Sequence, residues 1–215
     1  KLVILGLHPI GHDTSAAIID DGRVLFAIEE ERLSKEKHST KFPFKAIQKC
    51  LDETKMNISD IDIISLSGDY TLQAKNRYLE FWNKYYRSNI HRILNEIDVF
   101  KNNNNLVTFI RENLNFSKEI FQCHHHSAHF ASSFYTSKFE ESSLYSIDGV
   151  GDYESSVSGY GKLNNIEIFE NMSVTYPISM GLLYTAITSY LGFIPHCDEG
   201  KVMGLAPYGN KKKYE

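Results

Sequence analysis

Short apolar runs separated by polar turns open the chain and predict a β-meander of three strands. The turn before the third run contains Asp21-Gly22, and both residue types tolerate the positive φ of a hairpin turn. The expected strands cover Leu2–Leu7, Ser15–Asp20 and Val24–Glu29.

Helical spacing of apolar residues after Pro43 predicts a helix, and an apolar run beyond it predicts a fourth strand. Aromatic and charged residues then alternate from Tyr70 to Ser117, which we interpret as a helical insertion with a polar loop at Asn102–Asn105. The expected elements outside this insertion are a helix over Phe44–Thr54, a strand over Ile61–Ser67, a strand over Ile120–Cys123 and a helix over His125–Ser137.

The same order of strands, polar Gly/Asp turn and helix returns near Ser143, with little residue identity to the first copy. The expected strands are Leu144–Ile147, Ser155–Lys162 and Ile166–Val174, followed by a helix from about Ser179 to Leu191. The pattern therefore predicts a duplicated α/β fold. A first lobe covers 1–142, with the insertion at about 70–117, and the beginning of a truncated second lobe covers 143–215.

The composition of the chain excludes some classes of protein. The chain has 215 residues, 23 Lys plus Arg, 27 Asp plus Glu and 42% hydrophobic residues, which is enough apolar material for a buried core. A net charge of −4 does not indicate the basic surface that nucleic-acid binding needs. No run of apolar residues is long enough to span a membrane. Three widely spaced cysteines favour a reducing, cytoplasmic setting. The oligomeric state is left open.

Histidines dominate the candidate chemistry. His125 and His129 are one helical turn apart, so their imidazoles share a helix face and can bind one metal ion. A zincin helix has Glu after its first ligand, whereas this chain has His126 there, which disfavours metalloprotease chemistry. The alternative is a helix start with one core histidine and solvated neighbours. Asp148 is equally an oxygen ligand or a turn residue.

Two further segments could line a cleft. His12 beside Asp13 could act as a general base near neutral pH, although an isolated pair of this kind is more often an exposed loop. The charged run at 29–32, with Lys37 and His38, indicates either a solvated face or a cleft-lining loop. The segment 198–209 is not a P-loop, because no Ser or Thr follows Lys201.

In combination these segments resemble the NodU/CmcH family of carbamoyltransferases. The resemblance spans almost the whole chain outside the insertion, with Asp152 where the family usually has Glu. The segments that carry it are Gly6-Leu7-His8 with His12-Asp13, Glu29-Glu30-Glu31-Arg32 with Lys37-His38, His125 to His129, Asp148-Gly149 with Gly151-Asp152, and Gly200 to Gly209.

The resemblance implies an actin-like (ASKHA, ribonuclease H-like) domain, followed in full-length members by a YrdC-like domain. That partner domain would make carbamoyl-adenylate from carbamoyl phosphate and ATP. The present domain would transfer the carbamoyl group to a hydroxyl of a small-molecule or sugar acceptor. The implied roles are a metal site, with Fe(II) as the expected ion, at His125, His129 and Asp148, catalysis by His12 and Asp13, and substrate or nucleotide binding by Lys37, His38, Gly149, Gly151, Glu199 and Lys201.

We expect this chain by itself to be inactive and to hold metal weakly, because the resemblance implies further ligands and an ATP loop beyond residue 215. One alternative is a relative of the tRNA threonylcarbamoyladenosine protein, although the chain shows no basic patch for tRNA. Another is a non-catalytic nucleotide-binding domain with structural histidines. The sequence does not identify the acceptor molecule. The aromatic residues in Tyr70–Ser117 either contact the acceptor or take part in ordinary helix packing.

Overall fold

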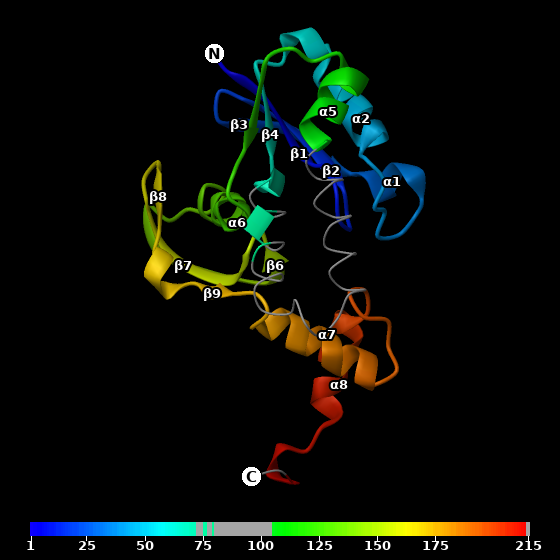
Figure 1. The fold of residues 1–215 in the computed structure, drawn as a ribbon, viewed down its shortest axis with the longest axis vertical. Helices are drawn as coiled ribbons and strands as arrows, with labels where there is room; N and C mark the ends of the chain where they lie inside the picture. The colour runs from blue at the N-terminus through cyan, green and yellow to red at the C-terminus, as the bar shows by residue number, and fades with distance from the viewer. Residues whose placement is uncertain (72–74, 77–78, 80–104, 214–215) are drawn as a thin grey trace. The chain divides into compact units, whose positions relative to one another are not determined.

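The computed structural model describes the whole chain except residues 72–74, 77–78, 80–104 and 214–215 (Figure 1). The chain forms two compact units, Lys1–Lys138 and Phe139–Glu215. Most of the predicted insertion lies outside the described residues, so its helices and its polar loop at Asn102–Asn105 stay predictions there. Its described end contains one helix, α5 (Leu106–Leu114).

The first unit is built on a mixed five-stranded sheet. Its strand order is β3-β2-β1-β4-β5, with antiparallel pairs β1–β2 and β2–β3 and parallel pairs β1–β4 and β4–β5. Leu5 at the centre is paired with Ile18 on one side and Ile64 on the other, and all three side chains are buried. The strands are β1 (Val3–His8), β2 (Ser15–Asp20), β3 (Arg23–Glu29), β4 (Ile63–Leu66) and β5 (Glu119–Gln122).

Helices supply the rest of the first core. Helix α2 (Phe44–Thr54) has the predicted bounds, and it buries Ala46, Ile47, Cys50 and Leu51 at helical spacing. Burial raises the pKa of the Cys50 thiol to about 11, so this cysteine is a packing residue. Further helical elements among the described residues of this unit include α1 (Glu30–Ser34), η1 (Ile58–Asp60) and α6 (His125–Phe134).

The second unit has an antiparallel sheet and two helices. Its strand order is β6-β7-β8, and the short β9 also pairs with β7. The elements are β6 (Glu141–Gly151), β7 (Glu154–Lys162), β8 (Asn165–Ile168), η2 (Glu170–Met172), β9 (Val174–Thr175), α7 (Met180–Tyr190), α8 (Glu199–Leu205), η3 (Ala206–Tyr208) and η4 (Lys211–Lys213).

The predicted α/β class is confirmed, and the mixed first sheet contains the expected meander. Two expectations about elements are wrong. The single strand Ile166–Val174 is divided into β8, a 3₁₀ turn and β9, because polar Glu170 and Asn171 interrupt the apolar pattern. The charged run is not merely a solvated face: it begins helix α1, and Glu30 is buried, where its Oε2 accepts a hydrogen bond from the Ala46 backbone N–H at 2.8 Å.

Among the described residues, no helix combines the length and the apolar character needed to cross a bilayer.

Helix α7 packs closely on strand β6 at Gly181. A Cβ atom added to Gly181 would lie 2.7 Å from the Asp148 carbonyl oxygen and 2.8 Å from the Gly149 nitrogen. These neighbours are backbone atoms and cannot rotate away as a side-chain end would. Ser179 reinforces the contact, since its Oγ donates to the Asp148 carbonyl at 3.0 Å and accepts from the Leu182 N–H at 3.1 Å. The start of α7 is therefore fixed to the end of the regular part of β6.

We predict that Gly181→Ala destabilises the second unit by about 1–3 kcal/mol, because overpacking must push helix and strand apart. Gly200→Ala is the matched control: Gly200 lies in α8, a Cβ added there would meet nothing within 4 Å, and alanine is the better helix former. Hydrogen exchange of the β6 and β7 amides measures both variants. Equal protection in the two variants would contradict the close contact.

Candidate functional site

The carboxyl ends of three parallel strands gather the candidate residues of the first unit at one edge of its sheet. His8 is the last residue of β1, Ser67 directly follows β4, and Cys123 directly follows β5. Backbone bonds extend the pairing into these loops, from Ser67 N–H to the Leu7 carbonyl at 3.0 Å and from Cys123 N–H to the Leu66 carbonyl at 3.2 Å. Loops at this edge of an α/β sheet commonly form binding sites.

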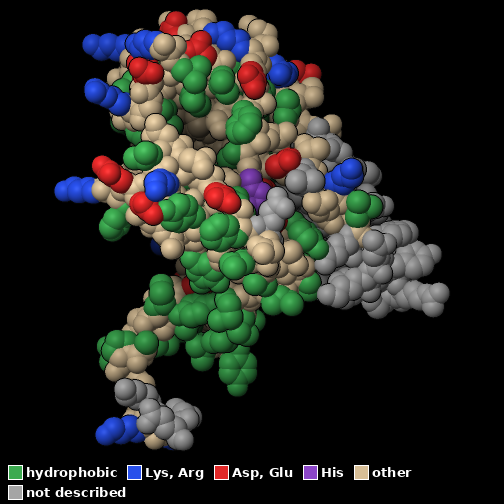
Figure 2. All heavy atoms as spheres, turned by 90° about the vertical axis from the view of Figure 1, so that its left-hand side faces the viewer, with side chains coloured by type: hydrophobic (Ala, Val, Ile, Leu, Met, Phe, Trp, Pro, Cys, Tyr) green, Lys and Arg blue, Asp and Glu red, His purple; other side chains and the backbone are tan. Residues whose placement is uncertain are grey.

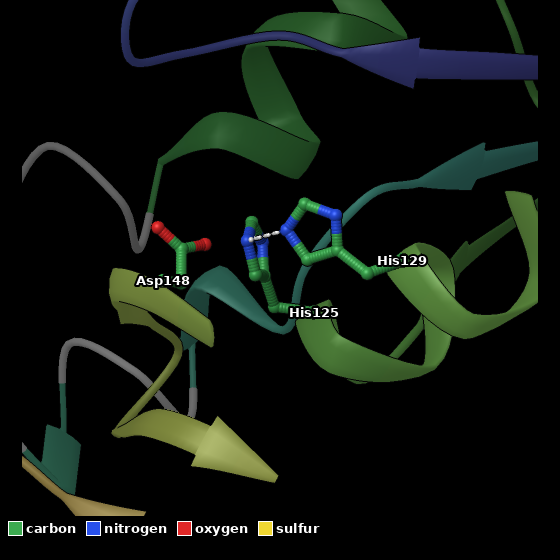
Figure 3. A group of neighbouring side chains, drawn as sticks. All are labelled: His125, His129 and Asp148. Carbon is green, nitrogen blue, oxygen red and sulfur yellow. Dashed lines mark hydrogen bonds between the residues drawn. The ribbon is translucent and has the colours of Figure 1, made fainter. Parts of the chain in front are cut away.

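Helix α6 begins at this edge and presents two imidazoles. Its buried side contains His126, Phe130 and Phe134, which are spaced at helical intervals and anchor the helix. His126 is the core histidine. His125 and His129 lie on another face, and their Nε2 atoms are 2.9 Å apart (Figure 3). One Nε2–H can donate to the other, unprotonated Nε2.

This separation fits a shared metal ion. Two imidazole nitrogens that each lie about 2.1 Å from one metal are roughly 3.0–3.4 Å apart, depending on the coordination angle. The 2.9 Å found between His125 and His129 needs only a small adjustment to reach that range. The two rings are also steeply inclined, with an interplanar angle of 80°. The imidazole pair therefore suits a divalent metal as well as a hydrogen bond between neutral rings.

His8 forms a series of polar contacts at the same edge of the sheet. Its Nδ1 is 2.7 Å from Ser67 Oγ, which is 3.0 Å from the Tyr70 hydroxyl, and its Nε2 is 3.2 Å from the His12 carbonyl oxygen. Burial, followed by the nearby His125, lowers the pKa of His8 below its usual value. A neutral His8 therefore adds no charge to the edge that carries the imidazole pair.

His12 and Asp13 form a hydrogen-bonded pair in the β1–β2 loop. His12 Nδ1 is 2.7 Å from Asp13 Oδ2, and the His12 side chain is 65% exposed. Asp13 Oδ1 is 3.0 Å from Nδ1 of His38, so one carboxylate joins two imidazoles. Burial alone would raise the pKa of Asp13, but the bonds from His12 and His38 outweigh it and lower that pKa. Asp13 is therefore ionised near neutral pH and can hold His12 with Nε2 free to accept a proton.

Glu31 completes this cluster from helix α1. Its Oε2 accepts a hydrogen bond from the His38 backbone N–H at 2.8 Å, and its side chain is largely buried. Single ligand atoms of Asp13, Glu31 and His38 all lie within 4.8 Å of one another. Lys37 precedes His38 and is exposed. The sequence indicates His38 and Lys37 as candidates, whereas Glu31 has no signal there beyond its place in the charged run.

In the second unit, Asp148 lies where the regular pairing of β6 with β7 is interrupted, between Ile147 and Gly151. Its Oδ1 accepts from the Gly149 N–H at 2.5 Å, and the residue is partly exposed. Figure 3 shows its carboxyl group at the end of the side chain. Gly149 faces the Leu182 side chain of α7. Asp152 is buried at a positive φ of 53°, a conformation that Asp adopts more readily than Glu. The Asp148-Gly149 turn is therefore packed against the start of α7.

Gly151 is buried at the end of β6, and the two remaining predicted residues of this unit lie on α8. Glu199 Oε1 accepts a hydrogen bond from the His196 backbone N–H at 2.7 Å, so it caps the loop that leads into the helix. Lys201 Nζ is 2.7 Å from Asp198 Oδ1, and the lysine side chain is 62% exposed. In the first unit, the structure brings His12, Asp13 and His38 together, and it separately brings His125 and His129 together. In the second unit, Glu199 and Lys201 both lie on α8.

Comparisons with known proteins identify relatives. The chain is 37% identical over 202 residues to "Nodulation protein NolNO" of Sinorhizobium fredii, covering 93% of this chain and 28% of that protein. It is 31% identical over 221 residues to "Uncharacterized protein sll1178" of a Synechocystis strain, covering 97% of this chain and 35% of that protein. The chain thus spans about a third of the length of these relatives.

Among solved structures, YeaZ from Pseudomonas aeruginosa overlaps 82% of this chain and 68% of its own, with a TM-score of 0.43 and 14% identity.

A family model described as "Carbamoyltransferase N-terminus" matches residues 3–214, which is nearly the entire chain. The chain belongs to the carbamoyltransferase N-terminus family.

Proposed function

We propose that this chain is the N-terminal part of an O-carbamoyltransferase that moves a carbamoyl group from carbamoyl-adenylate to a hydroxyl of a small molecule or sugar. Family membership supports the reaction class. The observation that carries the finer proposal is the exposed His12 imidazole, whose Nδ1 is bonded to the Asp13 carboxylate. A histidine held in this way is suited to removing a proton from an alcohol.

In the proposed transfer, His12 Nε2 takes the proton of the acceptor hydroxyl while the hydroxyl oxygen attacks the carbamoyl carbon. The new C–O bond forms, the bond from that carbon to the adenylate phosphate oxygen breaks, and AMP leaves. Asp13 fixes the ring orientation and stabilises the imidazolium that forms, as carboxylates do beside catalytic histidines. His38 holds the other Asp13 oxygen, and Glu31 holds the His38 backbone, so the carboxylate is fixed from two sides.

His125 and His129 are the proposed nitrogen ligands of a divalent metal, and Asp148 is the proposed oxygen ligand. Fe(II) is the proposed ion because the family resemblance implies it, and imidazole and carboxylate ligands are compatible with it. When bound, such a metal supplies Lewis acidity toward a carbonyl or phosphoryl oxygen. The chain's own contribution is the rigid placement of the two rings, which the buried side of α6 provides.

Cationic and backbone groups are proposed to bind the anionic substrates. Lys37 is exposed and directly precedes His38, whose ring contacts Asp13. Lys37 is therefore part of the loop that contacts the His12–Asp13 pair. In the second unit, the proposed nucleotide or substrate contacts are Gly149, Gly151, Glu199 and Lys201. ATP and carbamoyl phosphate are the proposed substrates of the complete enzyme, and a YrdC-like region is its proposed partner domain.

Replacing both His125 and His129 by Ala should weaken Mn(II) binding to this chain by more than about tenfold. Loss of a residue that only hydrogen-bonds to a metal ligand already lowers metal affinity by about tenfold or more, and this variant loses two direct ligands. Electron paramagnetic resonance of free Mn(II) measures the affinity without requiring activity. The exposed His196→Ala is the control and should bind like the parent. A double variant that binds Mn(II) as tightly as the parent would remove the metal assignment.

Transfer itself is tested in a fusion, named here the NolNO fusion, in which this chain replaces the part of NolNO that it matches. With carbamoyl phosphate and ATP, we expect carbamoylated products from a panel of sugars, detected by mass spectrometry. His12→Gln should lower kcat by about 10²–10⁴-fold, as loss of a general base does. Gln48→Ala on the exposed side of α2 is the control. Full activity of the His12 variant would exclude His12 as the base.

A further inference from the structure

Helix α7 and the residues that flank it contain unusually few charged side chains. No Asp, Glu, Lys or Arg occurs between residues 171 and 197. One side of the helix is accounted for, because Gly181 meets the β6 backbone and Leu182 faces Gly149. A helix that packs on a sheet by one side normally has polar residues on the other, and this helix has none that are charged.

The other side of α7 is an exposed apolar stripe. Met180, Leu183, Ile187 and Tyr190 follow one another at intervals of three, four and three residues, which places them on one helix face. All four are exposed, and Tyr190 is 88% exposed. The stripe is continued by Leu191, Ile194, Met203, Leu205 and Tyr208, all exposed. Figure 2 shows hydrophobic side chains gathered at the height where Figure 1 draws α7 and α8.

A contiguous apolar surface of this kind marks an interaction site. A membrane surface is the less suitable occupant, because helices that lie on membranes have a strongly charged face rich in Lys and Arg. Helix α7 has no charged residue at all. A helix with one apolar side packed on a sheet, a second apolar side exposed and no charged residue is more typical of the interior of a larger folded body.

We propose that the stripe formed by Met180, Leu183, Ile187 and Tyr190, with its continuation on α8, is the docking face for the polypeptide that relatives carry after the region matched here. The matched family region is an N-terminus, and the chain spans only 28% of NolNO and 35% of sll1178. These relatives therefore carry more than half of their residues outside it, which supplies a covering segment in the same molecule.

Methionine oxidation by dilute hydrogen peroxide tests this surface, because thioether oxidation depends on solvent access. The chain contains 4 methionines. Met180 and Met203 lie on the stripe and are 69% and 62% exposed, and Met172 in η2 is a matched control at 60%. Met56 packs against the core of the first unit and reports folding. In the chain alone, we expect Met172, Met180 and Met203 to oxidise at similar rates.

In the NolNO fusion, Met180 and Met203 should oxidise roughly tenfold more slowly, while Met172 is unchanged. Fast oxidation of both in a fusion whose Met56 is protected would overturn the proposal. Protection of Met180 and Met203 in the chain alone would also overturn the proposal. Protection at low concentration would mean that the chain itself covers the stripe, and protection that appears only as concentration rises would mean that a second copy covers it. Supplying the rest of NolNO as a separate polypeptide repeats the test if the fusion does not fold, with the same outcomes.

Discussion

Parallel pairing of β1 with β4 and of β4 with β5 is the constraint on which the first unit's site depends. Parallel strands end at a common edge, so the loops after His8, Leu66 and Gln122 must meet there whatever their separation in sequence. That edge receives His8 from β1, Ser67 from β4 and the start of α6 from β5. Side chains from segments far apart in the sequence thereby come within hydrogen-bonding distance, as His8 and Ser67 do.

The local parts of this arrangement can be predicted from the sequence. The spacing of His125 and His129 and the adjacency of His12 and Asp13 both lead directly to pairs in contact, at 2.9 and 2.7 Å. The bounds of α2 follow equally from its apolar spacing. These features depend on contacts within one helix or one loop, where the geometry of the backbone decides which side chains can meet.

The non-local contacts could not be predicted in the same way. Asp13 meets His38 across 25 residues, and His8 meets Ser67 across 59, with no periodic signal linking them. Glu30 belongs to a run that resembles a solvated face, yet it is buried and bonded to the start of α2. Only the folded register of the sheet brings these groups together, and a buried carboxylate is tolerated because a backbone donor compensates it.

We propose that the edge of the first sheet presents His125 and His129 as a preorganised pair of metal ligands. Anomalous diffraction from crystals of this chain grown with Mn(II) tests it most directly. Because this chain by itself should hold metal weakly, the crystals are saturated with Mn(II), and we then expect an anomalous peak at roughly 2.1–2.3 Å from Nε2 of both imidazoles. A map with no peak beside these two nitrogens, or with manganese bound only at Asp13, Glu31 and His38, would contradict it.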